Sequence, residues 1–479
     1  MAAITGSLLR WRDRLVALPV LDQDALLYLL ATIFASGTIA LAGSDDYRQW
    51  AEMALGPYLI ATVASWWVSR RRRRRRPSGE TSRAGDLLRR YLVLGLLVTV
   101  VLVPLGVEVV LRAQSKPGAH VQNEVTVIEA CADRVAHHKN CYLSNPKTIG
   151  TSVTSQSEDS FFPYLPGMIP FGLVNAISGP AELKDARIPL TGFSLLVIAG
   201  ALFVADTTSR RRWRIFQVVV ILPSGALPMV TGGDDLPVLA LMLLGLALAT
   251  RRRPVWSGVA MGLAGTLKFT AWPLLILLVL GVWDRQGRRA VWRYALAAAA
   301  VVVPVLGVGV GLAPHAFILN AIRFPLGLTK VKSPAASPLL GQELVTLFPA
   351  AKPELITMLT LLGLAAVGYG LLKWMPTNPQ RAAAFCGLAM LLATLLAPAT
   401  RFGYLIYPLD LLTWAVLLSP ITSPIEANPE VLEGPQEPPS GTSNRRSLNP
   451  MTGEVWPSPA SEGEIEGLTV VTTTPTSHS

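Results

Sequence analysis

The sequence predicts an all-α, polytopic integral membrane protein with about ten spans. Of its 479 residues, 51% are hydrophobic and only 15% are charged, and the mean hydropathy is +0.43. Soluble domains carry about 25% charged residues, so this balance excludes an ordinary soluble protein. Apolar runs of about 17–25 residues alternate with arginine clusters, which is typical of membrane helices separated by loops.

The arginine clusters account for the net charge of +11 and indicate membrane orientation rather than nucleic-acid binding. Arg70–Arg76 is an unbroken run that cannot enter lipid, so we expect it on the cytoplasmic side, against anionic headgroups. We expect no cleavable signal peptide, because Arg10, Arg12 and Arg14 precede a run without a small-residue cleavage site.

Taken in order, the chain begins with a basic amphipathic lead, residues 1–24, which we expect in the cytoplasm. The membrane domain, residues 25–420, follows. Its predicted spans are 26–41, 51–68, 91–111, 188–205, 215–230, 236–249, 294–312, 356–372, 382–396 and 402–418. An even number of crossings puts both termini in the cytoplasm. Residues 421–479 are rich in Pro, Ser, Thr, Glu and Gly and are predicted to be a disordered cytoplasmic tail.

One apolar stretch, residues 255–283, does not fit a single crossing. A single crossing would place the arginines from Arg285 to Arg293 outside, against the positive-inside bias. A broken hairpin with Lys268 at its tip resolves the conflict, since arms of about 14 residues reach about 20 Å into a core of about 30 Å. Such an element is tolerated only where it lines a protein cavity, so Lys268 is expected beside one.

Two polar segments, residues 113–180 and 314–353, are predicted to lie outside. In the larger one, apolar residues recur at helical spacing and predict a helix lying on the outer membrane surface. These residues are Val121, Val125, Ile128 and Ala132. Asn123 is placed to cap this helix, which puts Glu124 in its first turn. Phe161–Ser178 is apolar but contains three prolines, so it is predicted to be re-entrant or interfacial.

Carboxylates on the outer face are the first set of candidate catalytic groups. A carboxylate at the mouth of a membrane cavity can take a proton from an acceptor hydroxyl. Glu124 is the leading candidate, with Glu129 and Asp133 as alternatives. Each could equally be a solvated loop charge or a helix cap. Further outer carboxylates are Asp45, Asp46, Asp185, Asp234 and Asp235; the last two also fit a turn followed by a helix N-terminus.

Cationic groups near the membrane form the second set, because an ionisable residue at that depth is a functional hypothesis by default. Lys268 and Arg401 are suited to holding a phosphate headgroup, and Arg187 and Arg323 are further members. Their alternative roles are snorkelling, internal ion pairing or, for Arg401 with Tyr404, anchoring at the interface.

Motifs narrow the remaining possibilities. The sequence has no HExxH, CxxC, P-loop or nucleophile elbow, so these routes to hydrolases and NTPases are unsupported. Its three cysteines cannot form a disulfide framework. Cys131 and Cys141 lie in the outer segment, where a disulfide is permitted, and we predict one between them. Cys386 falls in a span and is predicted to be core.

Six segments, spread over roughly residues 90–420, together resemble the GT-C superfamily of polyprenyl-phosphate-dependent glycosyltransferases. Within it they are most similar to the actinobacterial family 87 proteins related to α-mannosyltransferases. The segments are NEVTVIEACADRV, FFPYLPGMIPFGL, KDAR, TGGDDLPVLALMLLGLALA, GVAMGLAGTLKFTAWP and RFGYLIYP.

The resemblance implies a GT-C-like transmembrane domain with helices in its external loops. It implies transfer of a sugar, with mannose expected, from a polyprenyl-phosphate donor to a cell-envelope glycan or lipoglycan outside the plasma membrane. GT-C enzymes carry an essential acidic residue in the first large external loop. Glu124 fits that position, with Glu129 and Asp133 as fallbacks, although the family more often has Asp there. Asp45 and Asp46 could compete, because spans 26–68 precede the GT-C module.

The resemblance also implies a pocket for the lipid phosphate, to which we assign Lys268, Arg401 and Tyr404. Candidate substrate-binding residues are Asp185, Arg187, Asp234, Asp235 and Tyr164. The scheme requires no cofactor, no divalent metal and no nucleic acid. A lipid-linked-sugar flippase or transporter, or a structural scaffold, would have the same topology. A flippase predicts polar residues along its cavity at all depths, whereas here they concentrate at the outer face, which favours the enzyme.

Overall fold

The computed structural model describes residues 18–75, 83–116, 118–143, 161–326, 329, 331 and 335–418, all within one compact unit. Residues 1–17 of the predicted lead, residues 144–160 of the large outer segment and the predicted tail 421–479 lie outside these ranges. The described residues form helices and turns, with a single isolated bridge between Ala336 and Thr400. The all-α prediction is therefore confirmed.

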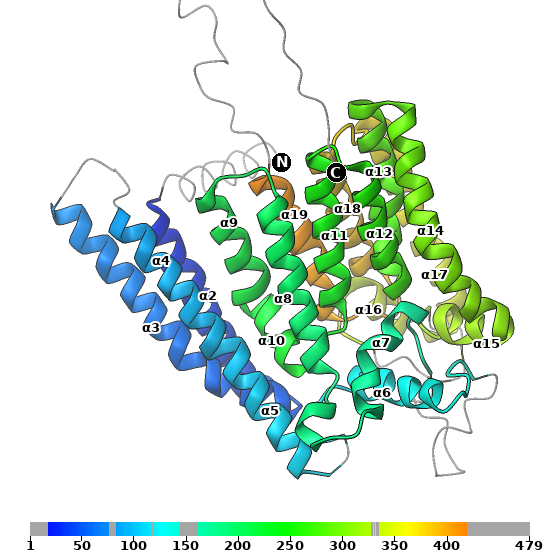
Figure 1. The fold of residues 1–479 in the computed structure, drawn as a ribbon, viewed down its shortest axis with the longest axis horizontal. Helices are drawn as coiled ribbons and strands as arrows, with labels where there is room; N and C mark the ends of the chain where they lie inside the picture. Colours follow the sequence, from blue (N-terminus) through cyan, green and yellow to red (C-terminus); the bar gives the residue numbers. More distant parts are fainter. Residues whose placement is uncertain are drawn as a thin grey trace, which may run out of the picture. The chain divides into compact units, whose positions relative to one another are not determined.

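The first helices form an antiparallel group along one side of the bundle (Figure 1). They are α2 (Val20–Leu41), α3 (Asp45–Arg75), α4 (Arg83–Leu96), the π-helical η1 (Leu97–Leu102) and α5 (Val103–Gln114). At 1.5 Å per residue, the 31 residues of α3 extend about 46 Å, which exceeds a hydrocarbon core of about 30 Å. The end of α3 that carries Arg70–Arg74 is thus long enough to project from the membrane.

Helix α6 (Asn123–Ala136) lies crosswise at the end of the bundle where α5 ends and α8 begins (Figure 1). Val125, Ile128 and Ala132 of the predicted stripe are fully buried, so the stripe packs on protein. Helix α6 begins at Asn123 itself, which leaves Glu124 in its first turn. Cys131 and Cys141 form a disulfide. The proline-rich stretch that follows is broken into η4 (Pro166–Met168), α7 (Ile169–Gly172), η5 (Leu173–Ala176) and η6 (Ala181–Lys184).

The central helices fill the middle of the bundle. They are α8 (Arg187–Val204), α9 (Ser209–Phe216), η7 (Gln217–Ile221), α10 (Pro223–Thr231) and α11 (Asp235–Thr250). Residues 209–221 and 223–231 are bent by 45° against each other, at the position of Pro223. Gly232 has φ +116°, a conformation that glycine adopts without strain, and it forms the turn that leads to Asp234 and Asp235.

Residues 254–286 form the predicted broken hairpin, from α12 (Pro254–Leu267) through η8 (Phe269–Ala271) to α13 (Trp272–Gln286). Helix α14 (Arg288–Leu312) runs in the same direction as α12, because Gly258 faces Tyr294 and Gly262 faces Ala298. Helix α13 connects them and so returns to the end where α12 began. Lys268 lies at the break between the arms, as predicted.

The C-terminal part completes the bundle. It contains α15 (Pro314–Phe317), η9 (Ile318–Arg323), α16 (Leu340–Leu347), η10 (Pro349–Ala351), α17 (Lys352–Lys373), α18 (Pro379–Leu396), η11 (Phe402–Leu405) and α19 (Ile406–Leu417). The helix ends that carry the arginine clusters lie at the opposite end of the bundle from α6 (Figure 1). This separation agrees with the positive-inside pattern of the sequence.

Each of the ten predicted spans coincides with helical residues, and the protein is a polytopic helical membrane protein. By length and composition, six helices of the described chain can cross a membrane, or seven if the bent pair 209–231 is one span. Two predicted spans fall below the length of a full crossing, since α11 has 16 residues and α19 has 12.

Candidate active site

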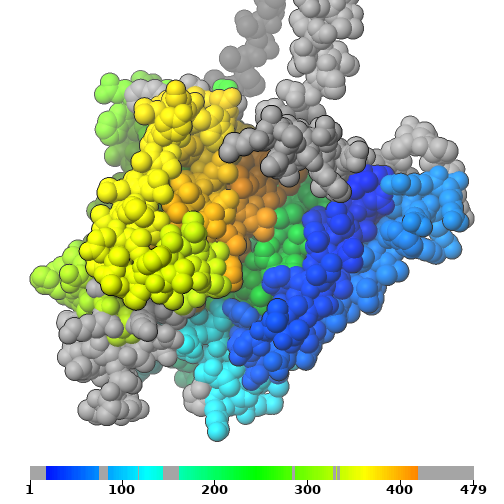
Figure 2. Space-filling view, turned by 180° about the vertical axis from the view of Figure 1, so that it is seen from behind, coloured from blue at the N-terminus to red at the C-terminus, as the bar shows by residue number. Residues whose placement is uncertain are grey.

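A cavity of about 1290 Å³ opens between α2, the start of α6, α10, the hairpin tip and the start of α19. Its apolar walls come from Leu27, Leu30 and Phe34 of α2, from Leu222 and Leu227 around α10, and from Leu405 and Leu409 at α19. Its charged residues are Glu124, Asp234, Asp235, Lys268 and Arg401, and Tyr404 is among its polar residues. Figure 2 shows this face, where green central segments are visible between the dark blue α2 and the orange C-terminal helices.

The first polar pair of the cavity is Glu124 with Arg401. Glu124 extends from the first turn of α6, where the helix dipole favours a negative charge, and its carboxylate forms an ion pair with Arg401. Arg401 precedes η11 in a connection that backbone bonds hold in place. The Ser337 N–H donates to the Thr400 carbonyl (2.8 Å), and the Phe402 N–H donates to the Ser337 hydroxyl (3.1 Å).

The start of α6 is fixed by polar contacts of Gln122. Its side-chain amide donates to the Tyr47 hydroxyl (2.6 Å) and to the Thr231 hydroxyl (2.8 Å), and its N–H donates to the Thr231 carbonyl (3.2 Å). These bonds tie α6 to α3 and α10, so two other helices determine where Glu124 lies.

The second polar group of the cavity surrounds Lys268 at the hairpin tip. Its ammonium lies 2.7 Å from Asp234 Oδ2 and 2.6 Å from Asp235 Oδ1. The Tyr407 hydroxyl donates to Asp235 Oδ1 (2.6 Å) and lies 2.7 Å from the Thr270 hydroxyl. The ring of Tyr164 lies 5.2 Å from Lys268 Nζ. With all three charged groups ionised, the group carries one net negative charge, so it suits hydroxyl donors better than an anion.

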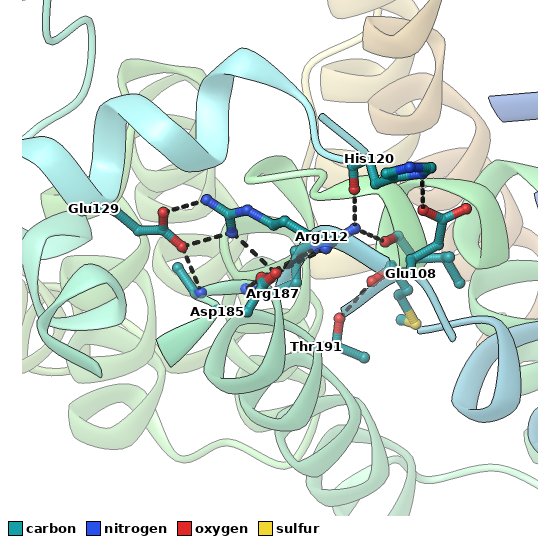
Figure 3. Close-up of polar contacts among 10 residues, drawn as sticks. Glu108, Arg112, His120, Glu129, Asp185, Arg187 and Thr191 are labelled. Carbon is teal, nitrogen blue, oxygen red and sulfur yellow. Dashed lines mark hydrogen bonds and ion pairs between the residues drawn. The ribbon is translucent and has the colours of Figure 1, made fainter. Parts of the chain in front are cut away.

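Glu129, Asp185 and Arg187 lie in a separate buried network, drawn in Figure 3. Glu129 binds the Arg112 guanidinium through both oxygens (2.9 and 2.6 Å) and accepts from the Ala186 N–H (2.9 Å). Arg112 also lies 2.9 Å from Asp185. The network joins α5, α6 and the start of α8, and none of its residues lines the cavity.

Arg187 completes the network. Its guanidinium donates to Asp185 Oδ2 (2.7 Å) and to the carbonyl groups of His120 (2.9 Å) and Val230 (3.1 Å). Burial alone would raise the pKa of the Asp185 carboxyl, but hydrogen bonds and charge from Arg187, with the charge of Arg112, hold it below its usual value. Asp185 is therefore an ionised structural partner of two arginines.

Asp133 points into solvent. Its side chain is 51% exposed and lies 3.5 Å from His137 one turn along α6. Of the three acids predicted as the base, only Glu124 lines the cavity. The other predicted site residues that line the same cavity are Lys268, Arg401, Tyr404, Asp234, Asp235 and Tyr164. Those that do not line it are Asp133, Glu129, Asp185 and Arg187.

Sequence reasoning missed several polar residues of this site. Tyr407 and Thr270 complete the surroundings of Asp235, and Gln122 and Tyr47 position α6. Tyr407, Thr270 and Gln122 are close in sequence to Arg401, Lys268 and Glu124, and this closeness could have identified them. Tyrosines near a membrane boundary, however, are also ordinary interfacial anchors. Among the described residues, no group of three or more His, Cys, Asp or Glu side chains could hold a metal ion.

Comparisons with known proteins bear on this site. No curated protein matches the sequence. Among solved structures, the chain is similar to the crystal structure of ArnT from Cupriavidus metallidurans bound to undecaprenyl phosphate, with a TM-score of 0.43 and 17% identity. That alignment covers 68% of this chain and 59% of ArnT, so the chain spans less than two thirds of ArnT's length. Residues 168–398 match the model of glycosyltransferase family 87. The match covers 231 of the 479 residues, and over this part the chain is similar to glycosyltransferase family 87.

Proposed function

We propose that this protein is a glycosyltransferase that moves a sugar, mannose, from a polyprenyl-phosphate donor to a hydroxyl of a cell-envelope glycan or lipoglycan. The acceptor lies outside the plasma membrane, on the side of α6. The observation that carries the proposal is that one cavity joins the Glu124–Arg401 pair to an apolar wall along α2. A lipid-linked phosphate needs both a cation for its headgroup, which Arg401 supplies, and an apolar surface for its chain, which α2 supplies.

The direction of the cavity supports a lipid donor. The end of α2 near Leu41 leads into the start of α3, where Tyr47 contacts Gln122 beside Glu124. The other end of α2 pairs with the arginine run through Asp22 and Arg73. The cavity wall along α2 therefore runs from polar at the α6 end to apolar toward the arginine end. A prenyl chain fits this gradient, since each buried CH₂ contributes about 0.8 kcal/mol.

In the proposed reaction, Arg401 and Tyr404 hold the donor phosphate, and a guanidinium can bind two phosphate oxygens at once. Glu124 takes the proton of the acceptor hydroxyl as its oxygen attacks the anomeric carbon. The bond from that carbon to the phosphate oxygen breaks, and polyprenyl phosphate leaves with the electron pair. One displacement at one face inverts the anomeric configuration, and no cofactor takes part.

The ion pair suggests how base and donor are coordinated. Arg401 is the partner of Glu124, so a donor phosphate would compete with Glu124 for that guanidinium. Binding of the donor would release the carboxylate to accept a proton, and the charge of Arg401 would then stabilise the leaving phosphate.

The aspartates at the hairpin tip have a different part in the proposal. We expected Lys268 to bind phosphate, but two carboxylates already neutralise it. We reassign the group to the sugar, whose hydroxyls can donate to Asp234 and Asp235 while Lys268 holds these side chains in position.

The deciding experiment is transfer of radiolabelled sugar from a synthetic polyprenyl-phosphate donor to membrane glycans, with membranes lacking the protein as the blank. Replacing Glu124 by Gln should lower the rate by roughly 10²–10⁴-fold, the usual contribution of a general base. Asp133→Asn is the matched control, because it makes the same chemical change on the solvent side of α6. Near-normal transfer by Glu124→Gln would place the base elsewhere, and movement of the lipid-linked sugar without bond formation would favour the flippase.

A further inference from the structure

Helix α2 lies outside residues 168–398, the region that matches family 87, yet it forms one wall of the cavity. Its lining residues are Leu27, Leu30, Ala31, Phe34 and Thr38. They recur at helical spacing and make a continuous stripe about 16 Å long, about half of the hydrocarbon thickness. The stripe is apolar except for Thr38, which lies at the end nearer α6.

The stripe is held in place by a different face of α2. Tyr28 and Ala35 are buried, and α2 packs along α3 over much of its length. Phe34 meets the ring of Trp50 edge-on at 6.5 Å, and the Trp50 indole donates to the Val100 carbonyl (3.0 Å). The packing against α3 therefore fixes the direction in which Phe34 presents its ring to the cavity.

The opposite wall comes from the start of α19, and the floor comes from the bend between η7 and α10. The residues of the opposite wall are Leu405, Ile406 and Leu409, and those of the floor are Leu222 and Leu227. Leu30, Phe34 and Leu409 stay exposed by 54%, 47% and 42% although they line the cavity. The space between the walls is thus open to the surrounding hydrocarbon, which lets a long chain enter from the side.

From these contacts we infer that α2 determines which prenyl chains the enzyme accepts as donors. The inference rests on the proposed function and names the part of the donor that α2 recognises. The occupant is a prenyl chain because the stripe is continuous with the phosphate-binding end of the cavity and becomes apolar away from it. Leu30 and Phe34 are the most exposed residues of the stripe, so their side chains are the ones that a bound chain can contact.

Two variants of α2 test this inference, and both replace an aliphatic side chain by tryptophan, so we expect similar effects on folding. Leu30→Trp adds bulk inside the cavity. Ile33→Trp adds the same bulk three residues on, at a position that is 59% exposed and does not line the cavity. Both sites face hydrocarbon, so a difference between the variants reports the cavity and not insertion of the helix.

The first measurement is the ratio of kcat/KM for a long-chain donor to that for a farnesyl-phosphate donor of the same sugar. Leu30→Trp should lower this ratio by about tenfold or more, because a hydrophobic site discriminates one methylene by about tenfold. Ile33→Trp should leave it unchanged. An unchanged ratio in Leu30→Trp, or an equal change in both variants, overturns the assignment of α2.

The second measurement does not depend on sugar transfer. The full-length protein is labelled with polyprenyl phosphate that carries a diazirine in an isoprene unit close to the phosphate, with and without unlabelled polyprenyl phosphate as competitor. Competed labels should map to residues 27–38 and should fall about tenfold in Leu30→Trp only. Competed labels on other helices overturn the inference. Labelling on α2 in a protein that transfers no sugar would refute the proposed function and leave only the binding of a prenyl chain by α2.

Discussion

Glu124 and Glu129 lie on the same helix, and the structure predicts opposite consequences when each is replaced by Gln. Glu129 is 7% exposed and makes three hydrogen bonds, two with Arg112 and one with the Ala186 N–H. Glu124 lines the cavity and pairs with Arg401, whose side chain is one third exposed. Glu129→Gln should therefore act on stability, and Glu124→Gln should act on the reaction.

The expected sizes follow from burial. Removing one partner of a buried pair costs about 3–5 kcal/mol, and we take the lower limit of about 3 kcal/mol for Glu129→Gln because Asp185 stays 2.9 Å from Arg112. Glu124→Gln breaks a partly exposed pair and should cost about 1 kcal/mol or less. The difference of about 2 kcal/mol is large enough to measure.

Unfolding in mixed micelles with increasing SDS, followed by tryptophan fluorescence, gives the free energy of unfolding of each variant. Transfer is then measured per folded molecule. Glu129→Gln should be less stable and still transfer sugar, and Glu124→Gln should be nearly as stable as the parent and inactive. If Glu129→Gln keeps its stability and loses transfer, our reading of the buried network is wrong and Glu129 is the better candidate for the base.

The remaining predictions test orientation, the hairpin and the disulfide. A cysteine at Arg288 should resist a membrane-impermeant thiol reagent applied from outside, whereas one at Asp133 should react; labelling at both positions would overturn the proposed orientation. Gly258→Leu should reduce the yield of folded protein strongly, because a Cβ there would lie 2.3 Å from a carbonyl oxygen of α14; Gly307→Leu on α14, where nothing lies within 4 Å of an added Cβ, should not. Replacing Cys131 and Cys141 by Ser should lower the free energy of unfolding by about 2–3 kcal/mol, since the bond closes a ten-residue separation; equal SDS midpoints would show that it contributes no stability.

The sequence by itself determined the class of the protein, the position of its helices and the broken hairpin. Span positions follow from runs of apolar residues, and the hairpin follows from arginines on both sides of residues 255–283, so both are local properties. Glu124, Lys268 and Arg401 could be singled out for a similar reason, because charged residues near membrane spans are costly and few.

Only the tertiary structure decided which charges meet. Glu124 and Arg401 are 277 positions apart, and Lys268 meets Asp235 from 33 positions away. Glu124 and Glu129 share one helix, yet one faces the cavity and the other faces Arg112. The sequence also did not predict that α2 forms a wall of the cavity. Composition gives the cost of burying a charge or exposing an apolar face to water, but the packing of distant helices determines which partner removes that cost.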